Sequence, residues 1–220
     1  GVFFKTQTQE DLRLRVVGEE LCRRDSSHTS FARFYAGYAS PVVVDSYEGL
    51  DKVAAVFEEV PANGVRPHVI VDLAAQTAAP LSRWIRDSDL LALLVSMGVT
   101  VNFWHMADAG QDSVDLLDRL INTFGAGPNY IAVKNEGRGS DFSQLEKSAA
   151  MKKALTLGAR VMTLGQLHEG SMRKIDRRNA SFWAAIHLTT GPDALGMLER
   201  QRVKTWLRNT YASLDALPLT

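Results

Sequence analysis

The chain of 220 residues contains a single cysteine, Cys22, and no long apolar run. One cysteine cannot form an internal disulfide, so the composition is typical of a reducing compartment, and we expect the cytoplasm. No apolar stretch approaches the ~20 residues that a helix needs to cross a bilayer. No signal peptide is visible either, so we expect no membrane partner. These absences exclude disulfide-rich secreted folds and helical membrane proteins.

The chain also lacks an excess of charge of either sign, since Lys+Arg and Asp+Glu both number 25 and the pI is near 7.2. A neutral chain has no overall electrostatic attraction for nucleic acid or anionic lipid. The local basic clusters are Arg173–Arg178 and Arg200–Lys204. An acidic and an apolar residue interrupt the first cluster and an apolar residue interrupts the second, which favours solvated helix faces. A contact of Arg173–Arg178 with DNA or a protein partner is the alternative.

Motifs for metal binding and nucleophilic catalysis are missing as well. The lone Cys22 and five scattered histidines give no metal-ligand spacing. No Gly-x-Ser-x-Gly elbow and no Cys/His pairing indicates a hydrolase nucleophile. Function must therefore come from residues that the fold brings together.

The most informative stretch is the apolar run Val69-Ile-Val, which ends on Asp72 and precedes the small residues of 73–80. Apolar residues without polar alternation predict a strand that is covered on both faces, as in a parallel sheet. Open α/β sheets bind ligands at the carboxyl ends of their strands, where Asp72 would lie. The alternative is that Asp72 only caps the following turn.

Strands and helices alternate along most of the chain. The pattern predicts strands at 41–45, 68–72, 99–104, 130–135 and 160–164, and helices at 47–60, 81–96 with a break near 87–89, 112–124, 143–158, 172–186 and 193–214. This order predicts an α/β fold: a three-layer sandwich with a mostly parallel sheet and helices on both faces. We expect one domain over 1–220, with a helical C-terminal region from about 165.

Polar side chains follow several of the predicted strands. Asp45, Asp72, Asn135 with Arg138, and His105 with Asp108 all come at strand ends. The carboxyl ends of parallel strands share one edge, so we expect these residues to converge there. A histidine beside Trp104 is more often structural than catalytic, so His105 is the weakest of these candidates.

The first two candidate strands, near Phe4 and at Leu12–Val17, are separated only by polar residues 5–11. A parallel pair needs a crossover of roughly a dozen residues, usually a helix. The strands are therefore antiparallel, or the helix lies elsewhere, or residues are missing between them.

The order from Val69-Ile-Val-Asp72 through 99–104 and the helix at Asp112 to Ala132-Val-Lys-Asn135 resembles the MinD/ParA-like branch of P-loop ATPases. It is most similar to members that act in plasmid mobilisation and stability. The resemblance implies an ATP-dependent molecular switch with ATP and Mg²⁺ as cofactors and a homodimer bridged by ATP. Asp72 would be catalytic and act on Mg²⁺ through a bound water, Asn135 would read the adenine edge, and Arg138 and Asp45 would help to bind the nucleotide.

The chain departs from that family in one important respect, because the Gly-Lys-Gly-Gly-x-Gly-Lys-[Ser/Thr] phosphate loop is absent. Lys5-Thr6 follows an apolar run but lacks every glycine of the loop. We therefore predict that residues are missing between Phe4 and Lys5 and favour an ATPase switch. The alternatives are a non-catalytic relative that serves as a binding or scaffold protein, and an unrelated α/β enzyme for a small metabolite.

Overall fold

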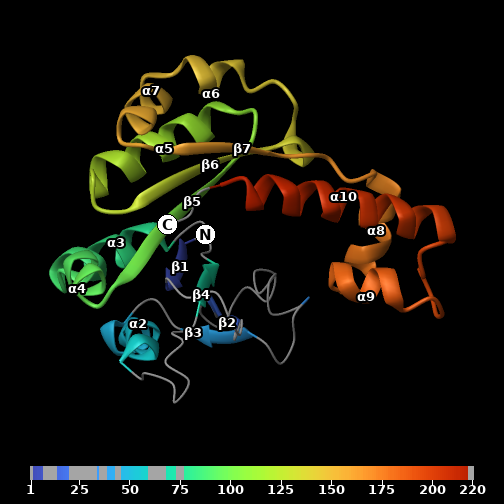
Figure 1. The fold of residues 1–220 in the computed structure, drawn as a ribbon, viewed down its shortest axis with the longest axis horizontal. Coiled ribbons are helices and arrows are strands. Elements are labelled where there is room, and N and C mark those ends of the chain that lie inside the picture. Colours follow the sequence, from blue (N-terminus) through green and yellow to red (C-terminus); the bar gives the residue numbers. More distant parts are fainter. Residues whose placement is uncertain are drawn as a thin grey trace. The chain divides into compact units, whose positions relative to one another are not determined.

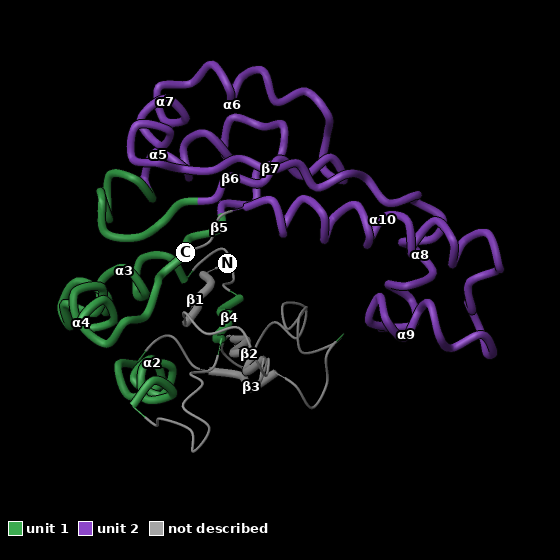
Figure 2. Tube along the Cα trace, viewed as in Figure 1, with its two compact units in different colours: residues 1–104, 120–130, 220 green, residues 105–119, 131–219 purple. Residues whose placement is uncertain are grey.

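The computed structural model describes residues 2–6, 14–19, 34, 39–42, 46–58, 68–72 and 77–217. Its contacts divide the chain into two compact units (Figure 2). Unit 1 comprises residues 1–104, 120–130 and 220, and unit 2 comprises residues 105–119 and 131–219. The chain passes between the units within single strands and helices, so neither unit is one continuous segment. The expectation of a single domain stays a prediction.

Unit 1 contains most of the strands (Figure 1). Their order is β3 (Ala39–Val42), β2 (Leu14–Glu19), β4 (His68–Asp72), β1 (Val2–Thr6) and β5 (Val99–Ala107). β2 pairs in parallel with β3 and β4, whereas β1 pairs antiparallel with β4 and β5. β4 matches the strand that the sequence predicts, and Val69 in its centre is fully buried.

The direction of β1 corrects the prediction of a missing segment after Phe4. β1 continues without interruption, with Phe4 opposite Val101 and Lys5 opposite Thr100. Because β1 is antiparallel to its neighbours, its connection to β2 needs no crossover helix. The prediction of absent residues between Phe4 and Lys5 is therefore wrong. The two strands do run antiparallel, but they do not pair with each other, because β4 lies between them in the sheet.

The helices of unit 1 are α2 (Tyr47–Ala54), the short 3₁₀ helix η1 (Ala55–Phe57), α3 (Ala78–Asp87) and α4 (Leu90–Ser96). The predicted break between α3 and α4 is confirmed, because Asp89 there takes a left-handed conformation with φ of 44°. A side-chain hydrogen bond links α2 to α3: Trp84 Nε1 donates to Asp51 Oδ1 at 2.8 Å. The core of this unit includes Phe57, Trp84 and Leu94.

Unit 2 contains a parallel strand pair, β6 (Asn129–Asn135) and β7 (Arg160–Leu164), in register from Ile131 opposite Arg160 to Asn135 opposite Leu164. Its other elements are α5 (Gln111–Phe124), η2 (Glu136–Arg138), α6 (Ser143–Lys147), α7 (Ala149–Thr156), α8 (Glu169–Arg177), α9 (Phe182–His187) and α10 (Met197–Asp215). In the C-terminal region the single helix predicted for 172–186 is instead two helices, α8 and α9.

The single helix that the sequence predicts for 143–158 is instead two helices, α6 and α7. Ser148 has an extended backbone, with ψ of 153°, and its hydroxyl accepts from the N–H of Met151 at 3.0 Å. Ser148 therefore starts a new helix in the middle of the predicted one. Ser143 and Glu146 have the spacing of a capping box, but none forms, because Phe142 is the N-cap residue of α6 and Glu146 pairs with Lys134 at 2.8 Å.

The fold is α/β, as the sequence predicts, and parallel pairings outnumber the antiparallel pairings of β1 among the described strands. This arrangement is consistent with a three-layer sandwich. Within the described part of the chain, no helix has both the length and the apolar character required to cross a membrane.

The start of α10 depends on the carboxylate of Glu199. Its Oε2 accepts from the N–H of Gly196 at 2.7 Å and from Lys174 Nζ at 2.8 Å. These contacts, the one with Lys174 first, hold the pKa of Glu199 below its ordinary value. A lowered pKa means that the folded state favours the carboxylate, so this stabilisation is present above the ordinary pKa of glutamate and is lost as the pH falls through the folded value.

We predict that Glu199→Gln lowers the free energy of unfolding at neutral pH by about 1 kcal/mol, because the amide keeps an acceptor for Gly196 but loses the charge opposite Lys174. Urea titrations of both proteins at several pH values measure the difference. It should shrink as the pH falls below the usual range for glutamate. A difference that stays constant with pH would contradict the role of the charge.

Candidate functional site

Asp72 ends β4 in unit 1 and is exposed, as the prediction of a strand-end carboxylate requires. Asp45 lies outside the described residues. Among the residues that the structure describes, no group of three or more His, Cys, Asp or Glu side chains could hold a metal ion. The catalytic role of Asp72 stays a prediction.

Asn135 and Arg138 belong to unit 2 and flank the short helix η2. Asn135 is the N-cap residue of η2, and its Oδ1 accepts from the N–H of Gly137 at 3.1 Å. Its acceptor atom is thus engaged in a turn. Arg138 is exposed at the end of η2. The structure places this pair at the end of β6, as expected, but gives Asn135 a structural contact.

Asp108 has a structural role as well. Its Oδ1 accepts from Ser113 Oγ at 2.7 Å and from the N–H of Gly110 at 2.9 Å, while Ser113 Oγ accepts from the N–H of Asp108 at 2.9 Å. The bonds from Ser113 and Gly110, in that order, hold the pKa of Asp108 below its ordinary value, with a smaller contribution from Arg138. Asp108 and Ser113 thus fasten the first turn of α5.

His105 lies within β5 rather than after it, because the strand continues to Ala107. Burial lowers the pKa of His105, which favours the neutral imidazole. A backbone hydrogen bond with Ser113 opposes that shift and joins His105 to the same turn. This setting supports the structural interpretation of His105.

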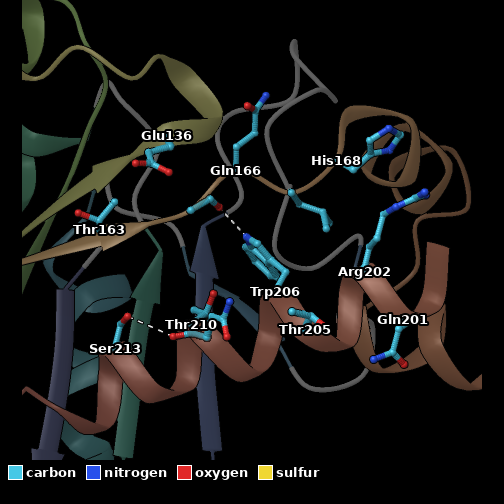
Figure 3. Close-up of a pocket in the computed structure, with 13 residues that line it drawn as sticks. Glu136, Thr163, Gln166, His168, Gln201, Arg202, Thr205, Trp206, Thr210 and Ser213 are labelled. Atoms are coloured by element: carbon cyan, nitrogen blue, oxygen red, sulfur yellow. Dashed lines mark hydrogen bonds between the residues drawn. The ribbon is translucent and has the colours of Figure 1, made fainter. Parts of the chain in front are cut away.

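A polar pocket of about 690 Å³ lies where β6 and β7 end (Figure 3). Its lining comes from the residue after β6, from the end of β7 and the loop that follows, and from one side of α10: Glu136, Thr163, Gly165, Gln166, Leu167, His168, Gln201, Arg202, Thr205, Trp206, Asn209, Thr210 and Ser213. Its volume is within the range of roughly 300–1,000 Å³ that small-molecule sites occupy. In unit 2, a pocket therefore lies at the strand ends, where the sequence predicts a ligand site.

The pocket is chemically different at its two ends. In Figure 3, Glu136 lies on one side of Trp206, and His168 and Arg202 lie on the other. A carboxylate accepts hydrogen bonds, whereas a guanidinium only donates them. The pocket therefore suits a polar ligand with donor groups such as hydroxyls at one end and an anionic group at the other.

Trp206 forms a fixed wall of this pocket. Its Nε1 donates to the carbonyl oxygen of Gly165 at 2.5 Å, and its ring packs against Phe182 with ring centroids 4.9 Å apart. The hydrogen bond joins α10 to the loop after β7, residues that are 41 positions apart in the chain. The described partners of Trp206 thus hold the two sides of the pocket together.

Sequence reasoning missed most of this pocket. The loop after 160–164 received no functional interpretation, although Gly165, Gln166 and His168 follow a predicted strand. Arg202 lies in the basic cluster Arg200–Lys204, which was interpreted as a solvated helix face. The end of the last strand was the available signal, since the same rule that selected Asp72 applies to it.

The basic side chains of Arg173–Arg178 are engaged locally. Lys174 pairs with Glu199 at 2.8 Å, and Arg177 pairs with Asp193 at 2.6 Å. Arg178 donates to the carbonyl oxygens of Leu188 and Thr190, each at 3.3 Å, and Arg173 pairs with Glu169 at 3.5 Å. These contacts favour a structural role for the cluster. A DNA or protein contact there stays a prediction.

We predict that Asn135→Ala lowers the free energy of unfolding by about 1 kcal/mol, the usual loss when a capping side chain is removed. Asn135→Asp keeps the oxygen that accepts from Gly137, so its stability should remain close to that of the wild type. Chemical denaturation of the three proteins measures this. Equal losses in both variants would contradict the capping role.

Comparison of the chain with protein-family models, with curated proteins and with solved structures finds no match.

Proposed function

We propose that this protein binds an adenine nucleotide in the strand-end pocket of unit 2 and is a non-hydrolysing relative of the MinD/ParA-like switches. The observation that carries the proposal is the pocket itself, which follows two parallel strands and has opposite charges at its ends. The nucleoside would lie beside Trp206, with its hydroxyl groups toward Glu136 and its phosphates toward Arg202. The order of strands and helices that resembles the family supports this proposal.

The chemistry of the lining fits a nucleoside. The lining also includes the amides of Gln166, Gln201 and Asn209, each of which both donates and accepts hydrogen bonds. Such groups can recognise the edge of a base, which is the role that the resemblance gives to Asn135. Asn209 and Gln166 are better placed for this role than Asn135, whose oxygen is engaged by Gly137.

Two observations favour binding without turnover. The sequence has no glycine-rich loop that could wrap phosphates with backbone N–H groups. β1 continues through Phe4 and Lys5, so no interruption there accommodates such a loop. Arg202 is then the principal cation for the phosphates in the proposed site, and its contact can position the ligand but supplies no metal.

We predict that Arg202→Ala weakens ATP binding about tenfold, because a charge-assisted hydrogen bond to phosphate contributes roughly 1.5 kcal/mol. Adenosine binding should not change, since adenosine has no phosphate. Titration calorimetry with ATP and with adenosine measures both constants. Arg208→Ala is the matched control, because Arg208 is an exposed arginine on the same helix that does not line this pocket.

The outcomes separate the alternatives. Equal losses for ATP and adenosine would show that Arg202 does not contact phosphate. If neither ligand binds the folded wild type, the nucleotide proposal is wrong. The scaffold protein and the α/β enzyme for another metabolite would then be the better explanations.

An active ATPase is the second candidate function, and the exposed position of Asp72 at the end of β4 favours it. If the protein hydrolyses ATP, Asp72→Ala should abolish turnover in a phosphate-release assay with Mg²⁺, because the resemblance makes this carboxylate catalytic. Asp112→Ala, an exposed aspartate in the first turn of α5, should retain turnover. Absence of turnover in the wild type would instead support the non-hydrolysing relative.

A further inference from the structure

A second hollow lies in unit 2, on a different side of α10 from the polar pocket. This groove has a volume of about 520 Å³ and is lined by Ile186 of α9 and, on α10, by Lys204, Leu207, Arg208, Tyr211, Ala212 and Asp215. The α10 residues recur at helical spacing and form one stripe along the helix. We call this stripe the α10 seam.

The α10 seam combines exposed charged and aromatic side chains with a partly buried apolar base. Tyr211 is 57 % exposed. No ion pair or hydrogen bond joins Lys204, Arg208 or Asp215 to another side chain in the described part of the chain. Leu207 and Ile186 pack against the buried cluster around Val203, so the base of the groove is firmly held. A fixed, amphipathic stripe of this kind is what a second helix would need.

The α10 seam is self-complementary: when a second copy of the seam runs in the opposite direction, each residue lies opposite one that it can contact favourably. If two copies of α10 lie antiparallel, with a twofold axis level with the midpoint between residues 209 and 210, Lys204 meets Asp215 of the other copy. In the same register Leu207 meets Ala212, and Arg208 meets Tyr211. Each contact occurs twice, as a twofold interface requires. Every member of the seam is thereby paired, with opposite charges at both ends and an arginine against an aromatic ring near the centre.

We infer that the α10 seam is a homodimer interface, in which α10 of one copy packs antiparallel against α10 of a second copy. The self-complementary charges select this occupant over an unrelated helix, which would have to supply the same pattern independently. The seam covers about 16 Å along the helix at ~1.5 Å per residue. Such a contact falls in the small class of interfaces, below about 1,200 Å², so the dimer is in equilibrium with the monomer. Nucleotide is not required for it, and the inference is independent of the proposed function.

The test uses charge reversal in the full chain without nucleotide, followed by sedimentation equilibrium over a wide range of concentration. Lys204→Glu and Asp215→Lys each place like charges at both ends of the interface, and each should weaken dimerisation by at least about tenfold. Lys152→Glu, which reverses an exposed lysine on α7, is the matched control and should leave the association constant unchanged.

Mixing the two variants makes the test specific. In a heterodimer of Lys204→Glu with Asp215→Lys, both end contacts again join opposite charges, so the mixture should associate more tightly than either variant alone. Tyr211→Ala, which reverses no charge, should also weaken the dimer, and circular dichroism checks that each variant is folded. A wild type that stays monomeric, a dimer insensitive to these changes, or a mixture that fails to recover association would overturn the inference.

Discussion

The parallel pairing of β6 with β7 is the constraint on which the site in unit 2 depends. Parallel strands bring their carboxyl ends to one edge, so Glu136 after β6 and the loop after β7 must lie near each other. The pocket becomes deep only because α10 closes its other side. The hydrogen bond from Trp206 to Gly165 fixes that closure, since it joins the helix directly to the backbone of the loop. The pairing of β6 with β7 positions the strand-end edge, and the hydrogen bond of Trp206 holds α10 over that edge.

Local patterns were enough to predict the α/β class and most elements, because burial imposes a periodicity on sequence. β4 and β7 have the predicted bounds, and the break at Asp89 was visible as a cluster of short polar residues. The patterns failed where a side chain with a possible local partner instead contacts a residue elsewhere in the sequence. Glu146 has capping-box spacing from Ser143, but it pairs with Lys134, which is distant in sequence. Such long-range competition leaves no trace in helical periodicity.

The candidate site was predicted only in outline, for a related reason. The strand-end rule directed attention to Asp72 and Asn135, but it does not say which later helix covers an edge. Two short helices, α8 and α9, separate α10 from β7, and the basic residues of α10 have the same spacing as those of a solvated face. In the structure this helix lines two hollows: Arg202 and Trp206 line the polar pocket, whereas Leu207 and Tyr211 line the groove. When two such stripes alternate along one helix, the sequence shows no single apolar or charged face that would reveal either of them.

The direction of β1 links the fold to the chemistry. A first strand that feeds a phosphate loop and a helix must be parallel to the strand that it joins, because the helix returns the chain to the starting edge. β1 is antiparallel to both β4 and β5, so its end lies at the opposite edge from the end of β4, where Asp72 is found. A residue following β1 is therefore poorly placed to act with Asp72 on one phosphate group. The same reversal that removes the need for a crossover helix thus argues against a phosphate loop after β1 that would act together with Asp72.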